Sequence, residues 1–523
     1  MVRQSYFKLY PAGRLQQKIF MLMKKKTFLL VYLIITFIFS QAVFAQAEIK
    51  NAILRGLDNC YGFRWSQAEI TFQRLIDKYH DDPRGYHYKS SIYFWYYFSN
   101  KDKADLQRFI EYSDQAIEKA VALLDNDENN TEILYILGAN YSYRAMAFTQ
   151  EGKFLDAVWA TKRSESFLNK VIELNPRFYD AYLGLGLYNF AMGQIPKAFQ
   201  WALSLAGMKG NKEKGLEYIK EAMTHGTYSR VEARFYYSQI LTDFFSDYST
   251  ASNYMNSLIA RYPNNLLFNY SLAVIYIKER KLDQAERILR RLRNTHTSKF
   301  KQLIAYSNFL TGDVLFKKNK FDSATVYYNK FILTTLDNDY TGIANYRLGV
   351  CYEFMGQKDV SKAYFKLSDR GNLDIDDDIY AKRRGELLAD EGFTKDDMDL
   401  IRFTHYVETG RYKTAVDSLS YLAKNTISND IKAEALLHLS DALFSLKRYE
   451  ASADTALTAK SLKIKNEKWI KPFACYFAAR AKEKLGEDAD AKLYLEQADD
   501  YKNYDYQNKL KNLLFALKSR EKF

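Results

Sequence analysis

The residues most suggestive of chemistry in this sequence are three aspartates that alternate in a short acidic stretch. Asp374, Asp376 and Asp378 have the spacing with which a calcium-binding loop begins. Such a loop needs a glycine at its sixth position and a glutamate at its twelfth, where this sequence has Ile379 and Gly385. The pattern therefore favours a solvated acidic link over a calcium site.

Other candidates for catalysis or metal binding are equally sparse. The sequence has no CxxC, HExxH or nucleophile-elbow motif, and its six histidines are scattered. Gly184 and Gly186 lack the third glycine and the preceding strand of a nucleotide-binding loop. Cys60, Cys351 and Cys475 are far apart and flanked by apolar or aromatic residues, which indicates buried free thiols. We expect no enzyme activity, no cofactor and no metal site.

Any site would be positioned by a chain of 523 residues that is 47% hydrophobic and contains only six prolines. So few prolines disfavour several linker-joined domains and favour one continuous helical body. The formal net charge of +13 first suggests nucleic-acid binding, but seven of the 76 basic residues lie in the first 45 residues, which contain no acid. We attribute the excess charge mainly to a targeting segment and expect no nucleic-acid partner.

Residues 1–45 have the pattern of a secretory signal peptide. Lys24 to Lys26 precede an uncharged run, and Val43 and Ala45 offer small residues before a cut ahead of Gln46. Met23 is also a suitable first residue for this signal. A second interpretation is therefore that translation begins at Met23 and that residues 1–22 reflect a misassigned start codon. The alternative is an uncleaved signal that anchors the protein in a membrane. Because no cysteine follows the cut, a lipid anchor is not expected. We predict a periplasmic or extracellular protein.

A repeat of small residues runs through the middle and the end of the chain. The steps between these residues are 34, 39, 37, 54, 37 and 39. An apolar-Gly or apolar-Ala pair lies twelve residues before several of them and a bulky residue lies four residues after, as in Gly312 with Tyr328 and Gly349 with Phe365. Small residues let two antiparallel helices touch, while bulky ones fill the gap to the next hairpin. The repeated positions are Ala251, Ala285, Ala324, Ser361, Ala415, Ser452 and Ala491.

These units resemble the tetratricopeptide repeat, a helix–turn–helix of 34 residues. The best match has Asn269 where the family pattern begins with Trp, followed by the matching residues Leu272, Ala273, Tyr276, Ala285, Leu289 and Leu292. The resemblance covers about residues 130–500 and implies an all-α solenoid of helical hairpins wound into a right-handed superhelix.

Residues 181–232 more narrowly resemble the tetratricopeptide repeat protein 39 family and the yeast inclusion-body-clearance protein, which are intracellular adaptors. The matching positions are Gly184, Gly186, Pro196, Leu203, Gly207, Gly210 and Gly215. Asn211 is expected to cap the helix that follows. The apolar insert 195–208, which contains Trp201, is either an extra helix packed on the solenoid or a surface that meets a partner or a membrane.

An aromatic ladder is the best candidate binding site. In the tetratricopeptide repeat family that these units resemble, the fifth residue of the first helix in each hairpin faces the concave groove of the superhelix. Rings there could grip an extended peptide, although packing on the neighbouring hairpin is an equal alternative. A clamp for terminal carboxylates is not expected, because these positions carry no lysine or asparagine. The ladder consists of Tyr135, Tyr236, Tyr270, Phe309 and Tyr346, and Trp201 is a further candidate.

Residues 93–98 are six consecutive aromatics. A helix would point them in all directions, so some are expected to contact a partner or to lie under a terminal cap.

The favoured function is an exported scaffold or adaptor that binds a protein or peptide. The alternatives are a glycan-binding surface component that uses residues 93–98 and a glycan-processing enzyme; peripheral membrane association and the oligomeric state are left open.

The predicted organisation follows from these patterns. It consists of a signal peptide (1–45), an N-terminal helical cap (46–126), a repeat array (127–369) with its insert (195–208), an acidic linker or irregular unit (370–400), and C-terminal repeats (401–523).

Overall fold

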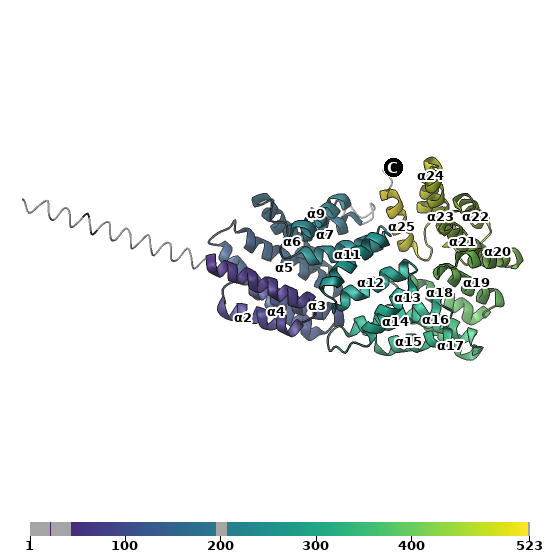
Figure 1. Cartoon of the computed structure of the whole chain (residues 1–523), viewed down its shortest axis with the longest axis horizontal. Helices are drawn as coiled ribbons and strands as arrows, with labels where there is room; N and C mark the ends of the chain where they lie inside the picture. The colour runs from purple at the N-terminus through teal and green to yellow at the C-terminus, as the bar shows by residue number, and fades with distance from the viewer. Residues whose placement is uncertain (1–20, 22, 24–42, 195–206, 521–523) are drawn as a thin grey trace, which may run out of the picture.

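The computed structural model describes residues 21, 23, 43–194 and 207–520, and these form helices without any strand (Figure 1). Most of the predicted signal peptide (residues 1–20, 22 and 24–42) and residues 195–206 of the insert, with Trp201, lie outside the described residues. Within the described ranges, no helix is both long and apolar enough to cross a membrane.

The N-terminal half is a series of antiparallel helix pairs. Asparagine side chains cap two of these helices: Asn130 accepts the Ile133 N–H, and Asn211 accepts the Lys214 N–H as predicted. The helices are residues 43–61, α2 (Trp65–Lys78), α3 (Pro83–Asn100), α4 (Lys103–Leu124), α5 (Thr131–Gln150), α6 (Phe154–Leu174), α7 (Ala181–Gln194) and α9 (Lys212–His225).

The pairs continue through the middle of the chain. Tight turns join the two helices of a pair, and Arg280, Asn319 and Gly356 occupy the left-handed region there. The helices are α10 (Arg230–Asp243), α11 (Tyr248–Arg261), α12 (Leu266–Lys278), α13 (Leu282–Arg293), α14 (Lys301–Lys317), α15 (Phe321–Thr334), α16 (Thr341–Phe354) and α17 (Lys358–Leu367).

The C-terminal part begins with a helix that has no hairpin partner. α18 packs against α16 and α17, whereas α19 pairs with α20. This additional helix explains the 54-residue step, and the linker alternative for residues 370–400 is wrong. The elements are the 3₁₀ turn η1 (Ser368–Arg370), α18 (Asp376–Glu391), α19 (Lys395–Glu408), α20 (Tyr412–Asn425), α21 (Asn429–Ser445), α22 (Tyr449–Ser461), α23 (Ile470–Leu485), α24 (Asp488–Asp500) and α25 (Gln507–Arg520).

The predicted repeat register is confirmed by burial. All seven small anchor residues lie on second helices, and all are fully buried. A Cβ atom added to Gly312 would lie 2.7 Å from the Tyr328 ring, and one added to Gly349 would lie 2.6 Å from the Phe365 ring. The bulky residue therefore packs onto the glycine of its own hairpin, which corrects the expectation that it fills the gap to the next one.

Two of the three alternating aspartates, Asp376 and Asp378, have structural roles. The buried Asp378 carboxylate accepts the backbone N–H groups of Tyr340, Ile343 and Asn372 at 2.8 to 2.9 Å. Asp376 accepts the N–H of Lys509 at 2.9 Å. These carboxylates are therefore not a solvated link: they hold the start of α16 and the C-terminal helix in place.

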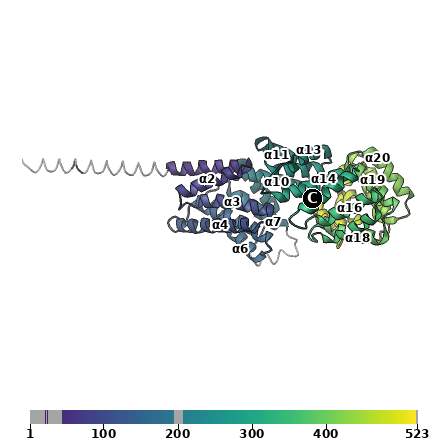
Figure 2. The ribbon, with the colours of Figure 1, turned by 90° about the horizontal axis from the view of Figure 1, so that it is seen from below.

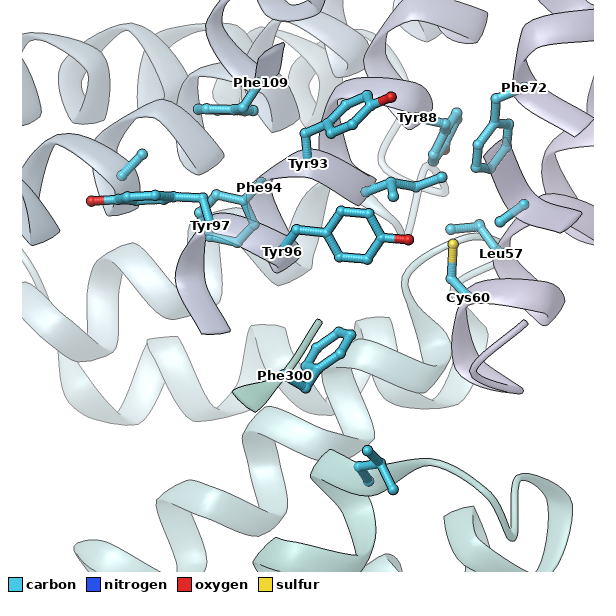
Figure 3. Close-up of a cluster of buried hydrophobic side chains, with 14 of the residues drawn as sticks. Leu57, Cys60, Phe72, Tyr88, Tyr93, Phe94, Tyr96, Tyr97, Phe109 and Phe300 are labelled. Atoms are coloured by element: carbon cyan, nitrogen blue, oxygen red, sulfur yellow. The ribbon is translucent and has the colours of Figure 1, made fainter. Parts of the chain in front are cut away.

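The N-terminal helices fold back onto the middle of the chain. Phe300, which is 1% exposed, contacts the rings of Phe63, Trp65 and Tyr96, and Figure 3 shows Tyr96 and Phe300 converging from separate segments. Helices α2–α4 and the units around α18–α20 lie at opposite ends of the elongated body (Figure 2).

The three cysteines are buried free thiols, as predicted.

The aromatic run 93–98 mostly belongs to this N-terminal core. Tyr93, Phe94, Tyr96 and Tyr97 are buried, Trp95 is half-buried, and only Phe98 is exposed, at 41%. The run is therefore not available as a stacking platform for glycans, and the alternative of burial under the terminal helices holds for most of it.

Candidate functional site

The described residues enclose a channel of about 750 Å³ that we call the central channel. Its walls come mainly from the first helices of successive hairpins, which present their inner faces to it: α12, α14, α16, α19, α21 and α23, together with α18 and α25. A volume of this size lies within the range of ligand sites in proteins.

Charged side chains cross the central channel in a connected network. Arg280 bonds to Asp441, whose other carboxylate oxygen lies 2.7 Å from the guanidinium of Arg480. Lys317 lies 2.6 Å from Glu408. Although burial opposes ionisation, Arg280 and Arg480 lower the pKa of Asp441 to about 2, and Lys317 and Arg280 lower that of Glu408. The carboxylates are therefore ionised across the physiological pH range.

Aromatic rings accompany these charges. The Arg480 guanidinium lies 4.3 Å from the ring centre of Phe444 and 4.0 Å from that of Phe477. Within the described part of the chain, two buried polar atoms at the wall, Arg480 Nε and Thr404 Oγ1, have no hydrogen-bond partner. The channel thus combines ring faces, fixed charges and unused polar groups.

The C-terminal helix closes part of this channel. Lys509, Leu513 and Leu517 of α25 contribute to the lining. On the same helix, the Phe515 ring lies 5.4 Å from that of Phe245, and the Lys212 ammonium lies 4.0 Å from the Phe515 ring centre. Helix α25 therefore touches the loop after α10 and the start of α9.

A second channel of about 370 Å³ adjoins the first and contains two residues of the predicted ladder. Tyr270 and Phe309 line it, and Lys278, Arg347 and Asp377 line both channels. Tyr270 is half-buried, whereas Phe309 is buried against the rings of Phe331 and Tyr340.

The other ladder residues lie elsewhere. Tyr135 and Tyr236 line a smaller, separate cavity in the N-terminal half. Tyr346 is buried, with its ring 5.8 Å from Phe365 and 5.6 Å from Tyr380. The five rings do not form one continuous ladder, because the N-terminal helices close over the first part of the concave face.

Sequence reasoning missed the charged network of the central channel. Arg280, Asp441 and Arg480 belong to three separate hairpins: Arg280 lies in the turn after α12, Asp441 on α21 and Arg480 on α23. No local spacing marks them, so only their convergence in space identifies them.

Family models match two parts of the chain. Residues 169–369 match Iml2/tetratricopeptide repeat protein 39, and residues 402–466 match a tetratricopeptide repeat. This chain is a tetratricopeptide repeat protein. Its segment around α7 and α9 resembles the protein 39 family, as predicted from the glycines there.

Two of the solved structures that are similar to the chain are the P58(IPK) TPR domain and yeast Tom70. The P58(IPK) TPR domain is 14% identical with a TM-score of 0.21, and the match covers 72% of this chain and 94% of that one. Yeast Tom70 is 12% identical with a TM-score of 0.22, and the match covers 92% and 96%. A comparison with curated proteins finds no match.

Proposed function

We propose that this tetratricopeptide repeat protein is an exported scaffold that binds an extended segment of a protein partner in the central channel and the adjoining channel. The observation that carries the proposal is the central channel itself: about 750 Å³, bounded by the inner faces of successive first helices. Repeat proteins of this class mediate protein interactions, and their stacked hairpins form extended concave binding surfaces.

The partner segment should offer backbone peptide groups for hydrogen bonding and should carry some apolar or aromatic side chains. Because the charges of Arg280, Asp441 and Glu408 are already paired, a strongly charged ligand would have to break these pairs. Peptide groups could instead satisfy Arg480 Nε and Thr404 Oγ1, while apolar side chains pack on rings such as Phe477.

Site-specific photo-crosslinking tests this proposal. A crosslinking amino acid at Tyr412 in the central channel and another at Tyr270 in the adjoining channel should capture the same protein from the native host. Tyr421, an exposed residue of the same helix as Tyr412, is the matched control position. Capture from Tyr421 alone, or of unrelated proteins from Tyr412 and Tyr270, would contradict the proposal.

A substitution separates binding from packing. Tyr270→Ala should weaken capture by about 1 to 2 kcal/mol, as expected for a contact ring, with a small effect on the melting temperature. Phe309 is less suitable, because it is buried in the core. If Tyr270→Ala captures the partner as the wild type does, the adjoining channel is not part of the binding surface.

The export part of the proposal is supported by the sequence pattern of residues 1–45. N-terminal sequencing of the mature protein should begin at Gln46, and the protein should fractionate with the periplasm or the medium. A mature chain that retains residues 27–45 and sediments with membranes would favour the anchored alternative instead.

A further inference from the structure

A small cavity inside the N-terminal half has the composition of a binding site. It has a volume of about 70 Å³ and lies among the helix of residues 43–61, α3, α5, α7 and α10. We call it the tyrosine cavity, because its wall includes Tyr61, Tyr88, Tyr135, Tyr143, Tyr228 and Tyr236.

Three polar atoms at this cavity have no hydrogen-bond partner among the residues that the structure describes. They are the Tyr61 hydroxyl, the Tyr88 hydroxyl and His87 Nδ1, and Tyr88 and His87 are only 5% and 2% exposed. An unpaired buried polar group costs about 1 to 3 kcal/mol. Several such atoms at one cavity therefore point to a polar occupant.

Glu232 brings a negative charge to the same cavity without a cation to balance it. The Tyr143 hydroxyl donates to the Glu232 carboxylate at 3.1 Å, and among the described residues Glu232 forms no ion pair. Burial raises its pKa to about 7. The neighbouring Asp180 differs, because it accepts the N–H groups of Tyr228 and Ser229 and the Ser229 hydroxyl.

The walls of the cavity suit a cation. The Tyr228 ring lies 6.2 Å from Tyr88 and 6.5 Å from Tyr135, so several ring faces border a small volume next to the carboxylate. Aromatic faces attract ammonium groups, most strongly where water is excluded. An anion would be repelled by Glu232, and water alone would leave the carboxylate unbalanced once it ionises.

An apolar extension lies next to the tyrosine cavity. A second cavity of about 40 Å³ shares Tyr61 and Glu232 with it and is otherwise lined largely by apolar and aromatic side chains, including Phe63, Trp95 and Phe268. A cavity of about 150 Å³ holds benzene, so the two volumes together suit a ligand of about four to six non-hydrogen atoms.

We infer that these two cavities bind a small aliphatic primary amine, with the ammonium group beside Glu232 and the alkyl chain in the apolar extension. The ammonium donates to the carboxylate and to the free hydroxyls of Tyr61 and Tyr88, and it faces the tyrosine rings. The residues that line the tyrosine cavity are buried or half-buried and none of them is exposed, so the site takes a free small molecule and not a side chain of another protein. This site is separate from the central channel and does not depend on the proposed partner.

Calorimetry of the full chain with butylammonium chloride tests the inference, at pH 8 in phosphate buffer free of other amines. Butylammonium should bind with one-to-one stoichiometry and raise the melting temperature, whereas butan-1-ol, a neutral molecule of similar size, should do neither at the same concentration. Glu232→Gln should weaken binding at least tenfold. The matched control is Glu213→Gln, which removes an exposed carboxylate on α9 and should bind as the wild type does.

A second variant tests the cavity independently of the charge. Ala139→Leu adds a side chain at the wall of the tyrosine cavity and should abolish binding while Glu232 remains. The inference is overturned if butylammonium and butan-1-ol bind alike, if butylammonium does not bind, or if a folded Glu232→Gln or Ala139→Leu protein binds it with wild-type affinity.

Discussion

The Lys101 ammonium lies 2.7 Å from the Asp337 carboxylate, although 236 residues separate the two in the sequence. The same carboxylate accepts hydrogen bonds from Gln302 and Tyr306. The end of α3 is thus tied to the loop after α15. In a simple solenoid each unit contacts only its neighbours, so this closure couples hairpins that would otherwise unfold independently.

Phe300→Ala should loosen this closure. Because Phe300 is buried against three rings of the N-terminal helices, its loss should reduce the free energy of unfolding by about 3 to 5 kcal/mol. The N-terminal half should then melt in a separate, earlier transition, measurable by calorimetry. Phe154→Ala on the exposed face of α6 should leave the melting profile unchanged; a single unshifted transition for Phe300→Ala would show that the closure contributes no stability.

Ala285→Glu tests the repeat register. Ala285 of α13 is fully buried where α13 packs on α12. A glutamate there would place an unpaired charge between two close helices, so it should lower the free energy of unfolding by roughly 3 kcal/mol or more. Urea unfolding followed by circular dichroism measures the loss. Gln284→Glu places the same charge on the adjacent exposed position and should cost little. Equal effects of the two changes would exclude this register.

Gly215→Ala tests the close approach of α7 and α9. A Cβ atom at Gly215 would lie 2.6 Å from the Phe190 nitrogen and 2.8 Å from the Gly186 oxygen, so the backbones would have to separate. We expect a loss of about 1 to 3 kcal/mol in chemical unfolding. Glu217→Ala, on the exposed side of α9, is the control and should be nearly neutral. A neutral Gly215→Ala would mean that the glycines are not needed for this contact.

Glu232 should make stability depend on pH in an amine-free buffer. Its pKa is raised from 4.5 to about 7 by burial, so the native state holds more protons than the unfolded state between these values, and stability falls as the pH rises through this window. Glu232→Gln removes the effect, and the variant should exceed the wild type at pH 8 by on the order of 2 kcal/mol. The difference should vanish near pH 4.5.

Urea unfolding of the wild type and of Glu232→Gln at several pH values checks this prediction. The difference in the free energy of unfolding between the two proteins isolates the contribution of Glu232 from that of its neighbours. Burial lowers the pKa of His87 to about 3 and raises that of each nearby phenol and thiol, so these groups stay neutral from pH 5 to pH 8. A difference of the same size at pH 4.5 and pH 8 would show that Glu232 does not titrate in this range. The neighbouring phenols and thiol are those of Cys60, Tyr61, Tyr88, Tyr135, Tyr143 and Tyr236, and the neighbouring carboxyl is Asp180.

The hairpins could be predicted from the sequence because their signals are local. Wherever the two helices of a hairpin meet, one position must be small and a position four residues later must be large. Ala285 and Leu289 are such a pair, and both are fully buried. The cap at Asn211 and the small residues at Gly186 and Gly215 likewise act within one or two neighbouring elements. Such constraints recur at nearly constant spacing, so a single sequence reveals them.

The sites depended on contacts that the repeat pattern does not contain. Tyr135 and Tyr270 occupy equivalent positions in their hairpins, yet one lines a cavity of about 70 Å³ and the other a channel of about 370 Å³. The helix of residues 43–61 and α3 contribute to the wall around Tyr135, whereas the wall around Tyr270 comes from α10, α12, α14, α16 and α18. Sequence periodicity determined which faces are buried between neighbouring helices, whereas tertiary closure, through contacts such as Lys101 with Asp337, decided which concave residues remain accessible.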